Sequence, residues 1–529
     1  MIWVDREVKK IKERHFPLEW VDDMKTPSGR VHVGALRGVV IHDLIYKVLL
    51  ENNLKAKFTY VFNDMDPMDA IPAYLDKKIW EKYSGIPLNK VPSPVKGFQN
   101  FAQYFAQEFI DVFNSINCHP EIIWSSKLYA SGKMNDIIKK ILDNADKIRE
   151  IYYRISKNTR PDDWYPFSVT CEKCGKVGTT YVYKWDGRSV YYRCEPAMVE
   201  WAKGCGYEGK ISPFDGRGKL PWKLDWPAYW KNIGVTIEGA GKDHMSSGGS
   251  HEIATTVAKE VLNYQAPYPI PYEWFTIGGR KMSSSKGVGS SAKEISQILP
   301  PEVLRFLIVR TQIETALDFN PYGDTILNLF DDFDRCLNAY FDKLENKVAK
   351  GKPGEVALGF ARIAELSQVK PLPKKRFLLP RFRTVVNLLK TKTDLVKFFT
   401  EHKKTALTKE EKEILEERIV FANIYLKNYA KSEEKIEFLK ETPKNIKLTN
   451  EQKLFLSKLK EKLTTIKIKN KETIQNAVFE TLKENSLKPK EVFPGFYQLL
   501  IGRDFGPKAA DILIDFGIEN FIKKISQLP

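Results

Sequence analysis

The stretch Thr26-Pro27-Ser28-Gly29-Arg30-Val31-His32-Val33-Gly34-Ala35 decides the fold of this chain. Pro and Gly dominate its turn, and a helical pattern follows directly. Because the first turn of a helix carries unpaired N–H groups and the positive end of the helix dipole, such a turn suits a phosphate. His32 can donate an imidazole N–H to a phosphate oxygen, and Gly34 leaves room for a flat purine. The segment indicates an ATP site; the alternative is an ordinary turn with a surface histidine.

A second glycine-flanked segment occurs far along the chain. Its sequence is Gly278-Gly279-Arg280-Lys281-Met282-Ser283-Ser284-Ser285-Lys286-Gly287. Three cations flank a serine run, as expected of a mobile loop that brings ammonium groups onto a triphosphate. The alternative is a flexible basic linker. Paired with the first segment, this one predicts a loop that closes over ATP.

Strand-like and helical patterns alternate in the first part of the chain. Short β-rich runs at Lys57 to Phe62 and Tyr268 to Ile277 are mixed with helical patterns at Gly34 to Asn52 and His251 to Leu262. Such alternation is typical of a parallel sheet covered by helices. The predicted fold class is therefore α/β, with a sheet domain in two halves, 1–62 and 243–330, and an insertion over 63–242.

Residues 331–529 differ from the rest in charge and composition. They hold 40 Lys and Arg against 28 Asp and Glu, which is 12 of the chain's net charge of +17, and none of its 11 Trp. An amphipathic pattern over Glu410 to Tyr429 indicates helices. We expect an all-α domain over 331–529. Its cations suit a polyanion such as nucleic acid, and a solvated Lys-rich surface explains the charge equally well.

Four of the six cysteines lie close together in the insertion. Their spacing is Cys171-x2-Cys174-x19-Cys194-x10-Cys205. Four thiolates that include a Cys-x-x-Cys pair suit tetrahedral zinc, and four protein ligands leave no position for a catalytic water. We therefore predict a structural Zn²⁺ that folds a subdomain over about 165–215. The alternative is loose thiols beside a redox pair. Cys118 and His119 adjoin without clear further ligands, and we assign no metal to them.

The composition excludes several classes of protein. A hydrophobic fraction of 43% with 12% aromatics is too apolar for a disordered chain, and 29% charged residues are too many for a membrane protein. The apolar stretch Val39 to Leu50 is interrupted by charges, and Met1 to Trp20 lack the apolar core of a signal peptide. We expect a cytoplasmic protein that binds no membrane.

The two glycine-flanked segments resemble, in sequence and in order, the HIGH and KMSKS signatures of class I aminoacyl-tRNA synthetases. In that family the signatures lie at opposite ends of a split Rossmann fold, and the resemblance implies this fold here. It also implies that His32, Lys281 and Lys286 act in catalysis. The second lysine of the family signature falls on Ser284 in this chain, so Lys286 is expected to take over its work.

Other stretches resemble the class I lysyl-tRNA synthetases, and the resemblance covers most of the chain. It implies that Trp222, His244 and Thr26 contact the amino acid; two residues before Thr26, Met24 stands where the family often has Gly. The stretches that carry the resemblance are Leu220-Pro221-Trp222-Lys223-Leu224-Asp225-Trp226-Pro227-Ala228, Gly241-Lys242-Asp243-His244, Gly248-Gly249-Ser250 and, as in the helical anticodon-binding tail of that family, Gly502-Arg503-Asp504-Phe505-Gly506-Pro507-Lys508.

A lysine substrate needs a carboxylate for its ε-ammonium, because an unpaired buried charge is costly. Asp64 and Asp66 follow a strand-like run, where α/β sheets place ligand contacts, and either could serve. The alternative for both is an ordinary acidic loop. Asp243 could accept hydrogen bonds from the ribose of ATP, and its alternative is to cap the helix that starts near Ser250.

The resemblance implies ATP-dependent formation of lysyl-adenylate from L-lysine and its transfer to the terminal ribose of tRNA(Lys). Mg²⁺ is expected with the triphosphate, bound mainly by phosphate oxygens and water. The tRNA would occupy the catalytic cleft and the basic helical domain. The alternatives are an arginyl, glutamyl or cysteinyl synthetase, or a non-catalytic RNA-binding relative. The residues expected at ATP are Ser28, Gly29, His32, Gly34, Asp243, Met282, Ser283 and Ser284.

Overall fold

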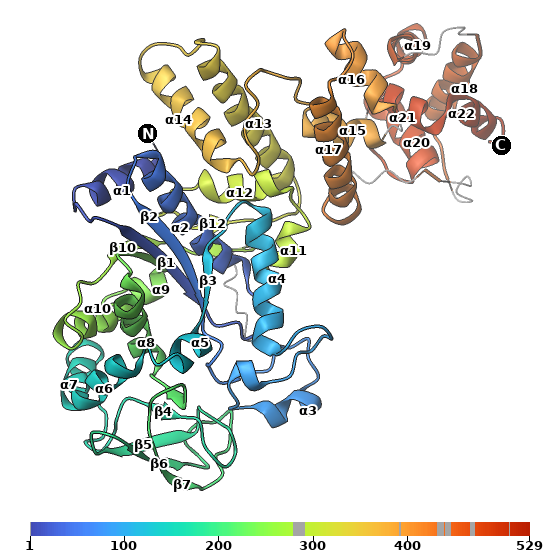
Figure 1. Ribbon diagram of the computed structural model, residues 1–529. Helices are drawn as coiled ribbons and strands as arrows, with labels where there is room; N and C mark the ends of the chain where they lie inside the picture. The colour runs from blue at the N-terminus through green and yellow to red at the C-terminus, as the bar shows by residue number, and fades with distance from the viewer. Residues whose placement is uncertain are drawn as a thin grey trace. The chain divides into compact units, whose positions relative to one another are not determined.

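The computed structural model describes residues 2–278, 291–390, 393–430, 438–439, 446–465, 471–506 and 508–528 (Figure 1). The chain divides into two compact units, one of Met1–Asn320 with Arg335–Lys375 and one of Pro321–Asp334 with Arg376–Pro529. Apart from Gly278, the second glycine-flanked segment falls in 279–290 and lies outside the described residues. Its predicted site residues are Lys281, Met282, Ser283, Ser284 and Lys286.

A five-stranded sheet, in the order β10-β9-β1-β2-β3, forms the centre of the first unit. All its neighbouring strands are parallel. Residues 58–62 of β2 are all buried, as expected of a strand with both faces covered. The predicted α/β class is confirmed. The strands are β1 (Glu19–Lys25), β2 (Ala56–Phe62), β3 (Glu121–Trp124), β9 (Ile237–Gly241) and β10 (Tyr268–Tyr272).

Helix α2 (Val33–Glu51) begins directly after the first glycine-flanked turn and packs against β1, β2 and β9. It is apolar nearly all round because α1 (Trp3–Lys12) and α12 (Pro301–Val309) cover its other side. The first unit also contains α9 (Lys242–Met245), α10 (Ser250–Glu260), α11 (Ala292–Ser296) and the paired strands β11 (Phe275–Thr276) and β12 (Leu317–Asp318).

The expected boundaries of the insertion differ from the structure, since β3 and β9 lie within 63–242 and belong to the central sheet. Both are short, and β9 has the sequence Ile-Glu-Gly-Ala-Gly, which forms no apolar run. The segments that leave the sheet are therefore 63–120 and 125–236. Their helices are α3 (Lys77–Trp80), α4 (Phe101–Ser115), α5 (Ser125–Ala130), α6 (Asn135–Asp143), α7 (Ala145–Ser156) and α8 (Trp222–Tyr229), with short turns of other helix types at Glu81–Tyr83, Leu88–Lys90 and Trp230–Gly234.

The cysteine-rich part of the second segment folds into two small sheets. A three-stranded antiparallel sheet has the order β5-β6-β7, and β4 pairs with β8. These strands surround the four clustered cysteines. Their bounds are β4 (Ser168–Val169), β5 (Thr180–Trp185), β6 (Val190–Cys194), β7 (Glu208–Ile211) and β8 (Gly218–Lys219).

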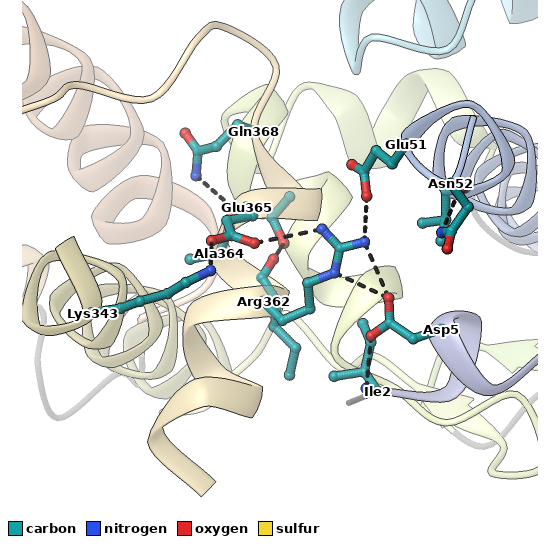
Figure 2. A network of polar contacts seen from close by, with 12 residues as sticks. Ile2, Asp5, Glu51, Asn52, Lys343, Arg362, Ala364, Glu365 and Gln368 are labelled. Atoms are coloured by element: carbon teal, nitrogen blue, oxygen red, sulfur yellow. Dashed lines mark hydrogen bonds and ion pairs between the residues drawn. The ribbon is translucent and has the colours of Figure 1, made fainter. Parts of the chain in front are cut away.

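Residues 335–375 belong to the first unit, although the expected boundary lay near 330. The division falls inside α13 (Thr325–Leu344), so no break in helical pattern marks it. In α14 (Lys352–Ser367), Nη2 of Arg362 lies 2.5 Å from Oε2 of Glu51 in α2 and 3.1 Å from Oδ1 of Asp5 in α1 (Figure 2). Oε1 of Glu365 also lies 2.6 Å from the ammonium nitrogen of Lys343. The contacts of Arg362 hold α14 to α1 and α2, and the contact of Glu365 holds it to α13.

The regular secondary structure in the described residues of the second unit consists of helices, which confirms the all-α prediction. Apolar side chains of α18 to α22, such as Phe455, Leu459 and Phe496, form its core. No helix in the described part of the chain is both long and apolar enough to span a membrane. The helices after α14 are α15 (Phe382–Lys390), α16 (Leu395–Lys403), α17 (Lys409–Asn428), α18 (Asn450–Thr465), α19 (Lys471–Glu484), α20 (Pro489–Ile501), α21 (Ala509–Phe516) and α22 (Ile518–Ile525).

Candidate active site

A cavity of about 620 Å³ lies at the carboxyl ends of the central strands. It is lined by the end of β1 and the turn into α2, by residues after β2, by the end of β9 and by the segment from β10 to β11. Open α/β sheets place their ligands at this edge. Of the predicted residues that the structure describes, those that line the cavity are Thr26, Ser28, His32, Gly34, Asp66, Trp222, Asp243 and His244.

The turn that contains His32 is fixed by its position at the start of α2. His32 is the N-cap residue of this helix, and the backbone N–H of Ala35 donates to its carbonyl oxygen. A Cβ on Gly34 would lie 2.8 Å from Nδ1 of His32, so the glycine makes room first for this imidazole, whereas the sequence suggested a purine. Gly29 lies in the same turn but does not line the cavity.

The described residues on either side of the segment 279–290 lie near the first turn. His32 forms an antiparallel bridge with Ser291, and the N–H of Ala292 donates to the carbonyl of Val31 at 2.8 Å. On the other side of the segment, Phe275 lines the same cavity as His32. The residues that flank both signature segments are therefore at one edge of the sheet.

Thr26 is held by a buried polar network. Its hydroxyl donates to Oδ2 of Asp66, and Oδ1 of Asp66 accepts from Lys219 at 2.6 Å. Lys219 is 4% exposed and also lies 2.6 Å from Asp225. Asp66 therefore already has a cation as partner. Because Lys219 belongs to β8, the network joins the base of the cysteine-rich subdomain to the cavity.

Asp64, the other predicted partner of a lysine ammonium, does not line the cavity. Its Oδ1 accepts the hydroxyl of Ser125 at 2.9 Å and the backbone N–H of Ser126 at 2.8 Å. The carboxylate thus joins the end of β2 to the start of α5. Burial raises the pKa of Asp64. Its role in the structure is to fix α5, and we no longer assign it to the substrate.

Trp222 and His244 lie together at the cavity, as their predicted roles require. Their ring centroids are 5.6 Å apart in an edge-to-face arrangement. Trp226 stacks beside Trp222 at 6.1 Å but is buried, whereas Trp222 is 45% exposed. Of the two tryptophans, Trp226 belongs to the core and Trp222 offers a face to a ligand.

Asp243 lies in the first turn of α9, directly after β9, and lines the cavity. It does not cap α10, which has Gly249 as its N-cap residue. Instead, a carboxylate oxygen of Glu252 accepts the N–H of Gly248 at 2.7 Å. The capping alternative is therefore wrong, and Asp243 lies at the end of β9 on the cavity.

Two acids of the cavity, Asp23 and Glu238, were missed at the sequence level. Both lie inside strands, β1 and β9, and both are largely buried. Glu238 accepts the indole N–H groups of Trp226, at 2.9 Å, and of Trp230. Burial raises the pKa of Glu238 to about 8. No local motif marks these acids, because only the pairing of β1 with β9 brings them to one cavity.

The four clustered cysteines form a candidate metal centre. Their sulfur atoms all lie within 4.8 Å of one another, with 3.7 Å between Cys171 and Cys205 and 3.6 Å between Cys174 and Cys194. Four thiolates bound to Zn²⁺ at ~2.3 Å in a tetrahedron are separated by about 3.8 Å. The donor set and its spacing fit a zinc ion with no open position.

Cys118 is buried beside an arginine side chain. Nη1 of Arg305 lies 3.2 Å from its sulfur. Nδ1 of the adjacent His119 contacts the side-chain oxygen of Asn114 at 3.1 Å. Among the described residues, the Cys171 cluster is the one group of three or more potential ligands that could hold a metal. A second zinc at Cys118 has no support.

Comparisons with known proteins agree with this geometry. Residues 1–357 match the family model described as tRNA synthetases class I (K), and residues 379–528 match an anticodon binding domain. The lysine–tRNA ligase of Methanococcus maripaludis is 31% identical, with 97% of each chain covered. That of Methanocaldococcus jannaschii is 32% identical, with 99% of each chain covered. A solved glutamate tRNA ligase from Elizabethkingia meningosepticum has a TM-score of 0.44 at 13% identity and covers 96% of this chain and 98% of its own.

The fold and the cavity at its strand ends are those of a class I aminoacyl-tRNA synthetase, an ATP-dependent ligase with a helical anticodon-binding domain. Within that class, the chain belongs to the lysyl family, the tRNA synthetases class I (K).

Proposed function

We propose that this chain is a lysine–tRNA ligase of cytoplasmic translation. One observation carries the proposal: a single cavity gathers the turn with His32 together with Thr26, Trp222 and His244, in a chain whose relatives over nearly the full length are lysine–tRNA ligases. The substrates are L-lysine, ATP and tRNA(Lys).

ATP would bind with its phosphates at the start of α2. The helix offers its first N–H groups and the positive end of its dipole there, and Ser28 and His32 line the same place. Asp243 would accept the ribose hydroxyls. From the segment 279–290, Met282, Ser283 and Ser284 would contact the nucleotide, and Lys281 and Lys286 would reach the phosphates.

In the first step, a carboxylate oxygen of lysine forms a bond to the α-phosphorus. The bond between this phosphorus and the oxygen that bridges to the β-phosphate breaks, and pyrophosphate leaves with the electron pair. No protein nucleophile is needed, because positioning and charge stabilisation carry the reaction. His32, Lys281 and Lys286 would stabilise the charge that grows at the five-coordinate phosphorus. Mg²⁺, bound through phosphate oxygens and water, would supply further neutralisation of that charge.

In the second step, a hydroxyl of the terminal ribose of tRNA attacks the carbonyl carbon of the lysyl-adenylate, and AMP leaves. As in other class I enzymes, we assign the 2′-hydroxyl as the acceptor. The anticodon would bind the second unit. Bases stack on exposed aromatic side chains in single-stranded RNA complexes, and Phe479 and Phe505 of this unit are 61% and 59% exposed.

The four cysteines, Cys171, Cys174, Cys194 and Cys205, would hold a structural Zn²⁺. The small sheets around them have little core of their own, and metal binding would supply the folding free energy of this subdomain. Elemental analysis is expected to find one zinc per chain, and Cys171→Ser should lose it. A stable wild-type protein without zinc would contradict this assignment.

The proposed activity is tested by ATP–pyrophosphate exchange with single amino acids, measured both with and without tRNA. Lysine alone should support exchange. Exchange with arginine, glutamate or cysteine instead would assign the chain to another specificity, and no exchange under any condition would indicate a non-catalytic RNA-binding protein.

A further inference from the structure

The buried part of the cavity lining is acidic and phenolic. Asp23 comes from β1, Glu238 from β9, Tyr60 from β2 and Tyr272 from β10, and all four line the cavity. The exposed fractions of Asp23, Glu238 and Tyr60 are 9%, 3% and 1%. Four parallel strands thus bring two carboxylates and two phenols to one place, and such a lining suits a cation.

Three of the acids that line the cavity already have partners within the chain. Asp66 contacts Lys219 at 2.6 Å and accepts the hydroxyl of Thr26. Glu238 accepts the indole N–H groups of two tryptophans. Glu273 lies 2.8 Å from the ammonium of Lys242. Because each of these three carboxylates already has a donor within the chain, we do not assign the substrate ammonium to any of them.

Asp23 differs from these acids in what surrounds it. Its Oδ1 accepts the backbone N–H of Met24 at 2.8 Å, and its Oδ2 lies 3.6 Å from Nδ1 of His42. That nitrogen is 2.7 Å from the carbonyl oxygen of Gly38, and Nε2 of the same ring accepts the N–H of Gly239 at 2.7 Å. The imidazole is therefore the neutral tautomer that directs its proton to Gly38. Asp23 has no ion pair with a lysine or arginine among the described residues, and the charge of Lys25, two residues along the strand, favours its ionised form.

Gly38 lies close to this carboxylate. A Cβ at this position of α2 would lie 2.9 Å from Oδ2 of Asp23 and 2.7 Å from the hydroxyl oxygen of Tyr272. The two oxygens therefore converge on one point next to the helix, where any residue other than glycine would intrude. A primary ammonium carries three N–H donors and fits between a carboxylate and a phenol oxygen.

We propose that Asp23 binds the ε-ammonium of the substrate lysine, with the hydroxyl of Tyr272 as a second acceptor and Gly38 as the residue that keeps the position open. The inference rests on the proposed lysine–tRNA ligase function and names the specificity residue of its amino-acid site. Burial raises the pKa of Asp23, and an incoming cation would relieve this cost of a buried carboxylate.

Lys25 is the cation nearest to Asp23 along β1, and its position indicates how a lysine molecule would be oriented in the cavity. Its side chain follows Asp23 by two residues, lines the cavity, and belongs to the end of the strand that leads into the nucleotide-binding turn. A lysine molecule with its ammonium at Asp23 would therefore extend its carboxylate toward this turn, where adenylate formation requires it.

The test compares lysine with norleucine, which lacks the terminal ammonium, in ATP–pyrophosphate exchange. Asp23→Asn should raise the KM for lysine at least about 30-fold, as for removal of one partner of a buried charge pair, with a much smaller change in kcat. The ratio of kcat/KM for lysine to that for norleucine should fall by a similar factor. Gly38→Ala should raise the KM for lysine as well, because its Cβ would displace the oxygens of Asp23 and Tyr272.

Asp22→Asn is the matched control, because Asp22 is the preceding residue of β1, is buried, and does not line the cavity. This variant should keep the wild-type ratio of kcat/KM for lysine to kcat/KM for norleucine. An unchanged ratio in Asp23→Asn, with exchange still lysine-dependent, would overturn the inference and leave the proposed function intact. Absence of lysine-dependent exchange in the wild type would instead contradict the proposed lysine–tRNA ligase function. If Asp23→Asn does not fold, an unchanged KM in Gly38→Ala overturns the inference.

Discussion

The cavity of the first unit and the surface of the helical second unit differ in how their functional side chains are held. Around the cavity, charged side chains such as Lys219 and Glu238 are buried and fixed by partners from several strands. In the second unit, the aromatic side chains of Phe479 and Phe505 are exposed. A small amino acid is selected by a few desolvated groups, whereas a long polyanion is bound by many exposed groups that each contribute little.

The largest effect on the cavity is expected from Lys219→Met. This change leaves Asp66 and Asp225 buried without their shared cation, and it should lower the free energy of unfolding by about 3–5 kcal/mol. Lys242→Met is the control, since Lys242 is 58% exposed in its ion pair with Glu273 and should cost at most about 1 kcal/mol. Chemical denaturation measures both. Equal losses would contradict the buried network.

His32→Ala should reduce the rate of lysine-dependent exchange about 100- to 1000-fold, because the imidazole would no longer stabilise the charge at the α-phosphate. The affinity for tRNA(Lys), measured by filter binding, should stay the same, since the anticodon binds elsewhere. A parallel loss of tRNA affinity would indicate that the variant is misfolded and would remove His32 from catalysis.

Glu238 should make stability depend on pH. Burial raises the pKa of its carboxyl to about 8, above the value of ~4.3 in an unfolded chain. Between these values the folded state holds the proton more tightly, so stability falls as pH rises and levels off above about pH 8. Relative to Glu238→Gln, the wild type should lose about 1.4 kcal/mol per pH unit while the group titrates. Thermal denaturation across about pH 5 to 9 should show parallel curves for the two proteins if the assignment is wrong.

Phe505→Ala should have the smallest effect, and it tests the exposed aromatic surface of the second unit. Loss of one stacked base costs about 1–3 kcal/mol, so the Kd for tRNA(Lys) should rise roughly 5- to 150-fold. Exchange with free lysine should not change in the same variant. A wild-type Kd would show that this exposed ring does not contact the RNA.

Local patterns predicted much of the fold and part of the site. The turn around His32, the Cys-x-x-Cys pair and the helix at 410–429 are encoded by neighbouring residues, and the structure places each as expected. That neither Asp64 nor Asp66 is left for a substrate ammonium depends on distant groups, Ser125 for one and Lys219 for the other. Asp23 resembles an ordinary strand residue until Gly38 and Tyr272 meet it.

The central claim is that the turn at His32 and the segment with Lys281 bind one nucleotide triphosphate. A crystal structure with lysine and a non-hydrolysable ATP analogue tests this most directly. His32 and Lys281 should both lie within hydrogen-bond distance, about 3 Å, of phosphate oxygens of the same analogue. An analogue that contacts only one of the two segments, with the other on a separate surface, would contradict the account.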